Sequence, residues 1–375
     1  MHTMLNHTMT VARIEDDYGI GIAQVPIPEL PIRGALIKVT GCGLCGSDLD
    51  KLVHKKANPG SILGHEMVGV IEALSEYHLT GWEVGDRIVS AHHAPCRTCH
   101  YCLNDSESMC RQFKSTNFNP GGFSQFLALS EQHLLHTAFK IPPEITMEEA
   151  SCLEPLACVL RAIRRGGHPI NGSVLVVGLG FIGMLAAQAY QNDGNAVYGV
   201  DLDSSRCMLA KSQGYLMDAF DPVTESRRLH DTLHRHIPSS KVDTVFLTAV
   251  NEQSLELALS HVRDGGTIVV FTSAPEGTPI DPSTLYFREL NLITSYSPAL
   301  CDLQDAAHML FQHKVDVEPL ISHRLPLREI GDAFELYRSG QAIKVFVHMS
   351  TDETSSEEGK AETGQNVGTA ERRRS

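Results

Sequence analysis

The chain has 375 residues, of which 42% are hydrophobic and 20% are charged, and its formal net charge is −14 at pH 7. This length suggests two domains, and the acidic charge argues against nucleic acid or an anionic membrane as a partner, since both bind basic surfaces. No apolar run is long enough to cross a membrane, and the N-terminal residues carry no secretory signal, so we expect a cytoplasmic protein. In that reducing compartment its ten cysteines should bind metal or stay reduced rather than form disulfides.

Short β-rich runs beside glycines dominate the first part of the chain, at 34–39, 85–90 and 121–130. Helix signals are scarce there, which predicts a mostly β domain. The pattern changes at 146–165, where apolar residues follow helical spacing. Thr146 is the candidate N-cap of this helix, and Glu149 stands three residues later, as in a capping box.

Strands and helices then alternate, which is typical of a parallel, doubly wound α/β sheet. The expected strands are 173–178, 196–201, 242–249 and 266–273, and the expected helices are 183–193, 204–214 and 252–262. After residue 298, two helices and a strand at 344–349 do not obviously continue this sheet and could return to the first domain. We therefore predict one domain from 1–150 and 298–350, a second at 151–297, and a disordered tail at 351–375, which is rich in Glu, Ser, Thr and Gly.

A dinucleotide-binding fingerprint lies between the first strand and helix of this alternating region. It reads Gly178-Leu179-Gly180-Phe181-Ile182-Gly183, and its glycines allow a tight turn, close approach of a pyrophosphate and close helix packing. Asp201 ends the next strand, 18 residues after Gly183, where an acid accepts hydrogen bonds from the adenosine ribose and repels a 2′-phosphate. The motif therefore predicts binding of NAD in preference to NADP.

Four cysteines gather in one short stretch, with the spacing C-x2-C-x2-C-x7-C. Such a cluster can form disulfides, a redox motif or a metal site, and a reducing compartment favours the metal. Two residues between cysteines let both thiolates face one ion, and a closed set of four leaves no position for substrate. We therefore predict a structural zinc bound by Cys96, Cys99, Cys102 and Cys110; a nucleic-acid-binding zinc ribbon is disfavoured by the acidic charge.

Three further stretches complete a family pattern: "GCGLCGSDLDK" at 41–51, "LGHEMVGVI" at 63–71 and "LEPLACV" at 153–159. With the cysteine loop and the glycine motif, the chain resembles the zinc-dependent medium-chain alcohol dehydrogenases, and most of all their sorbitol or L-iditol 2-dehydrogenase branch. The resemblance implies a GroES-like catalytic domain built from both chain ends around a central Rossmann domain. It also implies a homodimer or homotetramer, for which the run 267–273 with 290–297 could supply an edge.

The resemblance also implies a second, catalytic zinc. Cys45 and His65 match the first two ligands, and Glu154 or Glu66 supplies the carboxylate; the sequence does not rank these two. Ser47 matches the hydroxyl that takes the alcohol proton, and Asp48 matches a carboxylate that orients His65. Many relatives carry a histidine proton relay at the position of Asp50, so the relay here could pass through Asp50 or through His54.

The predicted function is a zinc- and NAD-dependent dehydrogenase, with two zinc ions per chain, that oxidises a secondary alcohol of a small molecule, most simply a polyol. Glu154 in place of a cysteine gives an oxygen-rich site that suits a vicinal diol. A threonine-dehydrogenase-like or simple-alcohol activity is the alternative within enzymes. A non-catalytic NAD-binding protein on the same fold is the alternative outside them, although it predicts missing zinc ligands, and the candidate ligands are all present.

Overall fold

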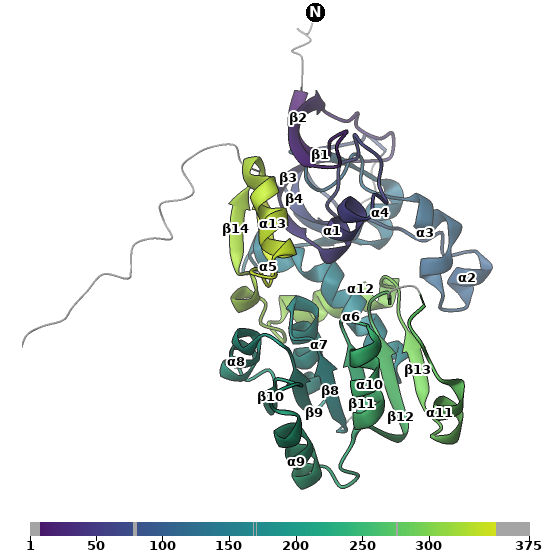
Figure 1. The fold of residues 1–375 in the computed structure, drawn as a ribbon. Coiled ribbons are helices and arrows are strands. Elements are labelled where there is room, and N and C mark those ends of the chain that lie inside the picture. Colours follow the sequence, from purple (N-terminus) through teal and green to yellow (C-terminus); the bar gives the residue numbers. More distant parts are fainter. Residues whose placement is uncertain (1–7, 78–80, 168, 170, 275–276, 350–375) are drawn as a thin grey trace, which may run out of the picture.

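The computed structural model describes residues 8–349 except 78–80, 168, 170 and 275–276. Two bodies lie one above the other in Figure 1, each around its own sheet. The tail predicted at 351–375 lies outside the described residues.

The upper body holds a seven-stranded sheet in the order β14-β15-β3-β4-β5-β7, with β6 paired to β3, and a separate hairpin of β1 and β2. Strand β15, near the end of the chain, pairs antiparallel with β3, so segments 300 residues apart lie side by side. The strands are β1 (Thr8–Ile14), β2 (Ile20–Pro26), β3 (Gly34–Leu44), β4 (Glu66–Leu74), β5 (Arg87–Ser90), β6 (Phe126–Ser130), β7 (Ala138–Lys140), β14 (His323–Pro326) and β15 (Val345–His348).

Short helices join these strands. Two of them, α2 and α3, project to the side of the body and form a small lobe (Figure 1). The helical segments of this body are α1 (Gly46–Val53), α2 (His100–Leu103), η1 (Glu107–Met109), α3 (Arg111–Ser115), α4 (Glu131–His136), η3 (Leu327–Glu329) and α13 (Ile330–Arg338).

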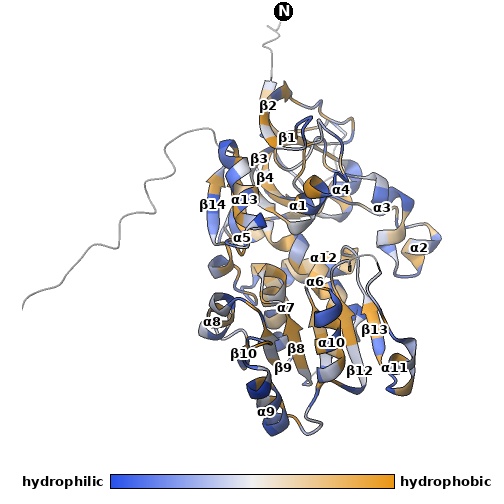
Figure 2. Cartoon of the chain, in the orientation of Figure 1, coloured by the Kyte–Doolittle hydropathy of each residue, from blue (hydrophilic) through white to orange (hydrophobic). Residues whose placement is uncertain are grey.

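The lower body is a six-stranded parallel sheet in the order β10-β9-β8-β11-β12-β13. Every residue of the central strand β8 is buried, as a strand covered by helices on both faces requires, and Figure 2 shows the apolar colour running along the central strands. The strands are β8 (Ser173–Val177), β9 (Ala196–Val200), β10 (Asp218–Phe220), β11 (Val242–Leu247), β12 (Val262–Val270) and β13 (Asn291–Thr294). The helices are α7 (Phe181–Asn192), α8 (Ser204–Ser212), α9 (Ser226–His236), α10 (Glu252–His261) and α11 (Pro282–Phe287).

Helices at the junction connect the two bodies: α5 (Met147–Ser151), α6 (Leu153–Arg165), α12 (Leu300–Phe311) and the short turn η2 (Glu318–Leu320). Thr146 caps α5 and exchanges hydrogen bonds with Glu149, as the sequence indicated. The helical run predicted at 146–165 is interrupted at Cys152, where the chain ends α5 and starts α6.

The predicted fold class is confirmed: a GroES-like β body combined with a doubly wound parallel sheet. Among the described residues, no helix is both long enough and apolar enough to cross a membrane.

Candidate active site and metal centres

Strand pairing brings three predicted ligands together at one end of the upper sheet. Gly43 lies opposite Glu66 in the β3–β4 register, so Cys45, just beyond β3, comes close to His65, just before β4. One ligand atom from each of Cys45, His65 and Glu66 lies within 4.8 Å of the other two. His65 and Glu66 are buried, with 6% and 1% of their surface exposed, and such a half-enclosed Cys/His/Glu set suits zinc.

Asp48 orients the His65 ring from behind. Its Oδ1 lies 3.3 Å from Nδ1 of His65, which leaves Nε2 for a metal, and Oδ2 accepts a hydrogen bond from the backbone N–H of Cys45. Burial alone would raise the pKa of Asp48, but His65, Lys51 and the backbone N–H of Gly64 together outweigh burial, and the pKa lies below its usual value. An ionised carboxylate at this position fixes the tautomer of a ligand histidine.

Ser47 lies on the open side of the same cluster, with Oγ 3.4 Å from Nε2 of His65. Asp50 lies on α1 and His54 directly follows it, and their side chains are 43% and 64% exposed. Asp50 accepts hydrogen bonds from Lys56 Nζ, the shorter at 2.8 Å, and its Oδ1 is 3.8 Å from Nε2 of His54.

Glu66 is paired with a residue that sequence reasoning missed. Its Oε2 accepts a hydrogen bond from Nζ of Lys344, which also donates to the carbonyl of Leu44 at 3.1 Å, and Lys344 is 2% exposed. Burial alone would lower the pKa of Lys344, but Glu66, Cys45 and Cys152 together outweigh burial and raise this pKa above its ordinary value. The other oxygen of Glu66, Oε1, is buried without a hydrogen-bond partner among the described residues.

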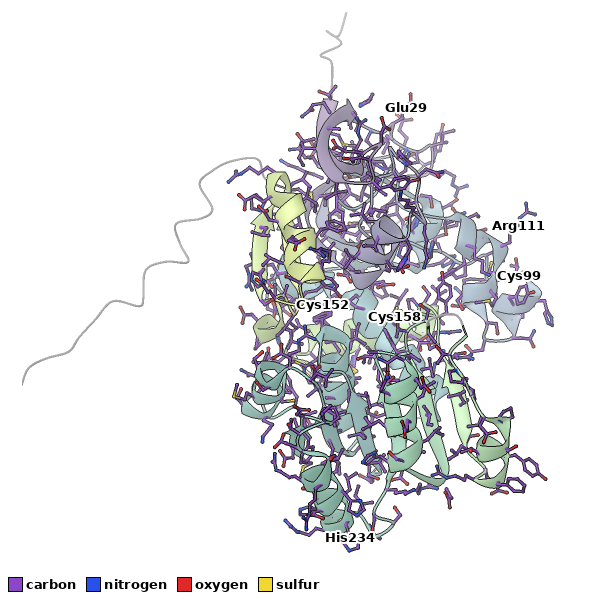
Figure 3. The ribbon with its side chains drawn as sticks, viewed as in Figure 1. Glu29, Cys99, Arg111, Cys152, Cys158 and His234 are labelled. Atoms are coloured by element: carbon purple, nitrogen blue, oxygen red, sulfur yellow. The ribbon has the colours of Figure 1, made fainter. Side chains whose placement is uncertain are left out.

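Glu154 lies in the first turn of α6 at the junction of the two bodies. It is 7% exposed, and its Oε1 accepts a hydrogen bond from the thiol of Cys158 at 3.5 Å. Figure 3 shows Cys158, one turn further along α6, at the boundary between the bodies. Burial raises the pKa of Glu154. Among the described residues, its carboxylate is not part of the close set formed by Cys45, His65 and Glu66.

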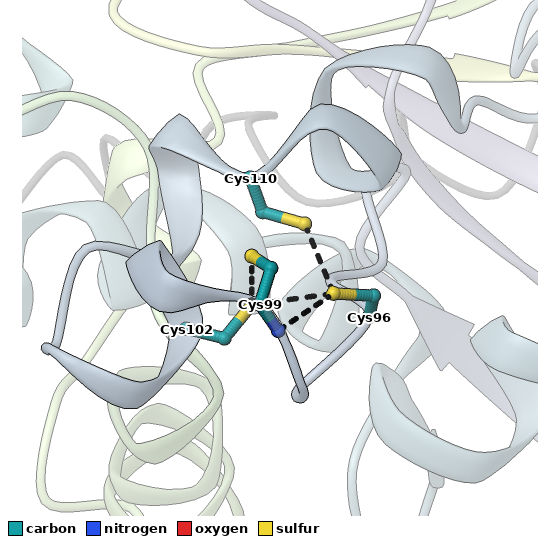
Figure 4. A group of neighbouring side chains, drawn as sticks. All are labelled: Cys96, Cys99, Cys102 and Cys110. Carbon is teal, nitrogen blue, oxygen red and sulfur yellow. Dashed lines mark hydrogen bonds between the residues drawn. The ribbon is translucent and has the colours of Figure 1, made fainter.

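The four clustered cysteines converge in the projecting lobe (Figure 4). Their Sγ–Sγ distances include 3.5 Å for Cys110–Cys96, 3.6 Å for Cys99–Cys102 and 3.9 Å for Cys96–Cys102. Four sulfurs bound tetrahedrally to zinc at about 2.3 Å would lie about 3.8 Å apart, so the spacing fits that ion. Contacts with Thr98 and with the backbone N–H of Cys99 lower the pKa of Cys96 to about 6, which favours the thiolate that zinc requires.

The glycine fingerprint forms the turn from β8 into α7. Gly178 has a φ of +92°, and a Cβ there would lie 2.2 Å from Oγ1 of Thr248. A Cβ on Gly183 would lie 1.9 Å from the carbonyl oxygen of Gly178, so only glycine allows this packing. Gly180 is the N-cap of α7, ahead of Phe181 and Ile182, and the nearest atom to a Cβ there is 3.9 Å away, which leaves the helix N-terminus open to a pyrophosphate.

Asp201 and Arg206 flank this turn at the end of β9. Oδ2 of Asp201 accepts a hydrogen bond from the backbone N–H of Leu179 at 2.6 Å, which ties the glycine turn to β9. Nη1 of Arg206 is 4.0 Å from the same oxygen, and Nη2 donates to the carbonyl of Gly340 in the upper body at 2.9 Å. Sequence reasoning missed Arg206; its position five residues after Asp201 was the available signal.

Two sequence families match the chain: Alcohol dehydrogenase GroES-like domain over residues 32–142 and Zinc-binding dehydrogenase over residues 182–312. The chain is a zinc-binding medium-chain dehydrogenase. It is therefore an oxidoreductase that uses zinc and a nicotinamide cofactor, and the expected enzyme class is confirmed. The sorbitol-like branch is not confirmed by these matches.

The individual relatives are named for different substrates of their own. The chain is 27% identical over 344 residues to L-threonine 3-dehydrogenase of Proteus mirabilis (strain HI4320), covering 90% of this chain and 98% of that enzyme. Galactitol-1-phosphate dehydrogenase from Escherichia coli is 25% identical, with a TM-score of 0.80 over 91% of this chain and 100% of that one. A zinc-binding dehydrogenase from Sinorhizobium meliloti 1021, solved with NADP, is 25% identical, with a TM-score of 0.79 over 91% of this chain and 99% of that one.

Proposed function

We propose that this dehydrogenase oxidises a secondary alcohol group of a polyol or a related hydroxylated small molecule, with NAD as the hydride acceptor. The observation that supports this proposal is the convergence of Cys45, His65 and Glu66 beside the exposed hydroxyl of Ser47. A three-residue set with one open side is the arrangement of catalytic zinc sites, whereas a set closed by four protein ligands is structural.

The residues present fit a catalytic zinc. We propose that Cys45 Sγ, Nε2 of His65 and Oε1 of Glu66 hold it, because Oε1 is a buried acceptor that otherwise lacks a partner. This ranks Glu66 above Glu154 as the direct ligand, because the Glu154 carboxylate lies outside the close set and accepts a hydrogen bond from Cys158. When bound, zinc supplies Lewis-acid polarisation of the substrate hydroxyl.

The chain's own residues then orient the substrate and move its proton. Ser47 is placed to take the proton of the substrate hydroxyl while it gives its own proton to solvent, because its exposed Oγ lies 3.4 Å from Nε2 of His65, a proposed zinc ligand. Asp48 keeps His65 in the tautomer that leaves Nε2 free. Lys344 holds Oε2 of Glu66 and leaves Oε1 without a hydrogen-bond partner among the described residues.

We propose NAD as the preferred cofactor because the carboxylate of Asp201 ends β9 beside the glycine turn, where it would repel a 2′-phosphate. Gly178, Gly180, Phe181, Ile182 and Gly183 would cradle the pyrophosphate. Arg206 weakens this preference, because its guanidinium lies 4.0 Å from Asp201 and would attract a phosphate. We therefore expect NADP to be used measurably, though less well than NAD.

The four-cysteine lobe is proposed as a structural zinc site, because Cys96, Cys99, Cys102 and Cys110 leave no position for a substrate.

The domain boundaries predicted from the sequence also remain a proposal. They assign 1–150 and 298–350 to the catalytic domain and 151–297 to the cofactor domain. The pairing of β15 with β3 supports this assignment.

A homodimer, or a tetramer built from dimers, is also proposed. Strand β13 forms one edge of the lower sheet, and three aromatic side chains near it are exposed: Tyr286, Phe287 and Tyr296, at 77%, 82% and 61%. A strand edge flanked by exposed aromatics is stabilised by pairing with a second copy. A cytoplasmic location is proposed because none of the ten cysteines is paired in a disulfide.

The second candidate is a threonine-dehydrogenase-like activity, favoured by the similarity to L-threonine 3-dehydrogenase. The deciding experiment measures kcat/KM with excess NAD for sorbitol, xylitol, 2,3-butanediol, threonine and ethanol, following absorbance of the reduced cofactor. We expect a polyol or diol to lead. If threonine leads, the second candidate replaces the first. If ethanol leads tenfold, about 1.4 kcal/mol of transition-state preference, the polyol proposal fails and the dehydrogenase class alone remains.

A further inference from the structure

Two histidines lie one turn apart on α9, a helix of the lower body. His230 and His234 are both exposed, and their rings are nearly parallel, with planes 6° apart and centroids 6.3 Å apart. Figure 3 shows His234 at the outer end of the lower body, well away from Cys158 at the junction of the two bodies. The pair therefore belongs neither to the proposed catalytic site nor to the four-cysteine lobe.

The spacing of the pair places both imidazoles on one face of α9. Residues i and i+4 of an α-helix are neighbours, with Cβ atoms about 5–6 Å apart. Two imidazole nitrogens bound to one ion at about 2.0–2.1 Å are about 3 Å apart, so two exposed rings need only turn toward each other to share an ion. Histidines at this spacing on a helix are a recurring zinc-binding pair.

A residue outside the helix orients the ring of His234. Its Nδ1 lies 2.7 Å from the hydroxyl of Ser240, in the loop that follows α9. When Nδ1 donates its proton to this hydroxyl, the lone pair of Nε2 is free for a metal. A hydrogen bond at the second ring nitrogen fixes the tautomer of metal-binding histidines and raises their basicity. Ser240 therefore stands to His234 as Asp48 stands to His65.

The arginines of α9 do not stand in the way of a cation at this pair. Arg227 shares the helix face of the histidines, but its Nε lies 3.9 Å from the carboxylate of Asp231, which offsets its charge. Arg235 follows His234 directly, and residues adjacent in sequence do not face each other on a helix. The net charge of −14 favours the approach of a cation to the protein as a whole.

We propose that His230 and His234 form a metal site, additional to the two proposed zinc sites, that chelates a divalent transition-metal ion through one nitrogen of each ring. Imidazole suits Zn²⁺, Ni²⁺ and Cu²⁺, whereas Ca²⁺ and Mg²⁺ prefer oxygen ligands. Cu²⁺ should bind more tightly than Ni²⁺ or Zn²⁺, as at other nitrogen sites. Since both side chains are exposed, water can fill the remaining positions on the ion, and the ion should exchange with solution.

The ion would stabilise a helix that packing anchors weakly. Helix α9 buries only Leu229 and Leu233, and most of the stability of a helix in a protein comes from such packing. An ion that binds the folded helix but not the unfolded chain stabilises the folded form. We therefore expect the amide hydrogens of α9 to exchange more slowly with solvent when the site is loaded.

The test titrates Ni²⁺ by calorimetry into the zinc-loaded, untagged protein and its variants. We expect one Ni²⁺ per chain, with an affinity at least about tenfold lower in His230→Ala and in His234→Ala, because a chelating pair becomes a single ligand. Ser240→Ala should lower the affinity by about threefold to tenfold. The matched control is His236→Ala, since His236 is exposed on the same helix but stacks on no ring among the described residues.

A second measurement follows amide hydrogen exchange in α9 with and without Ni²⁺. Exchange should slow in the unmodified chain and stay unchanged in His230→Ala. Both measurements are separate from alcohol oxidation, so the inference and the proposed function can fail independently.

Four results would overturn the site. These are no uptake of Ni²⁺, an unchanged affinity in His230→Ala, an equal fall in His236→Ala, or exchange in α9 that Ni²⁺ does not slow. Release of zinc during the titration, measured by elemental analysis, would place the Ni²⁺ in the zinc sites and overturn the inference as well. An unchanged affinity in Ser240→Ala would overturn the orienting role of Ser240.

Discussion

Replacing Asp302 with alanine should destabilise the enzyme far more than a surface aspartate would. Asp302 is 1% exposed on α12 and accepts hydrogen bonds from two arginines of α6, Arg161 at 3.5 Å and Arg164 at 2.9 and 3.2 Å. It also accepts from the backbone N–H of Ala299 at 2.8 Å, at the start of α12. Arg161 is 2% exposed, so the substitution would leave a buried guanidinium without its carboxylate.

Breaking a buried ion pair by removing one partner costs about 3–5 kcal/mol. Loss of the hydrogen bond at the start of α12 adds about 1 kcal/mol, so the effect should lie at the upper end of that range. Asp305→Ala, three residues along the same helix, is the matched control. Asp305 is exposed, and its removal should cost less than about 0.5 kcal/mol.

The assay is urea unfolding of the zinc-loaded protein, followed by circular dichroism, for the two variants and the unmodified chain. A change below about 1 kcal/mol for Asp302→Ala is the range of exposed ion pairs and would refute the buried-charge reasoning. A similar effect from Asp305→Ala would show that the helix surface, rather than the buried pair, is responsible.

Three further outcomes are expected. Cys99→Ser should lose one zinc and much stability, because binding of a structural metal is coupled to folding, whereas Cys45→Ser should stay folded but lose activity. Elemental analysis that finds one zinc or none in the unmodified chain contradicts the expectation of two zinc ions per chain. Asp201→Ala should weaken binding of NAD and raise the activity with NADP relative to NAD about tenfold. If the unmodified enzyme is already faster with NADP than with NAD at equal concentration, Asp201 does not select the cofactor. Phe287→Asp should shift the species seen by light scattering toward 41 kDa, while an unmodified chain that is already monomeric at micromolar concentration would remove the proposed β13 interface.

Local patterns predicted the elements of the lower sheet well. Strands β8 and β9 match the expected runs within one residue, because a continuous apolar stretch between turns is a strong signal for a buried strand. The prediction placed the start of β12 four residues late, since "VRDG" at 262–265 reads as polar and glycine-rich. Helix α9, "SRRLHDTLHRH", was not anticipated, because it buries only Leu229 and Leu233 and is otherwise charged.

The residues around the catalytic site show where sequence reasoning ended. Cys45 and His65 stand in short, specific motifs, so the family resemblance predicted both as ligands, and the structure brings them close together. Lys344 was missed because its partner Glu66 is 278 residues away and nothing local distinguishes a buried lysine from a surface one.

The pairing of β15 with β3 sets the order in which the enzyme can be completed during synthesis. Residues 8–74 leave the ribosome early, but β3 lacks one neighbouring strand, and Glu66 lacks its ammonium partner, until residues 344–348 follow. The lower sheet, built from one continuous segment, can fold in the meantime. We therefore expect nascent chains halted before residue 344 to have a lower sheet that resists protease, while the edge of β3 stays open to chaperones. Residues 344–348, translated after the other strands of both sheets, complete the part of the enzyme nearest its chemistry.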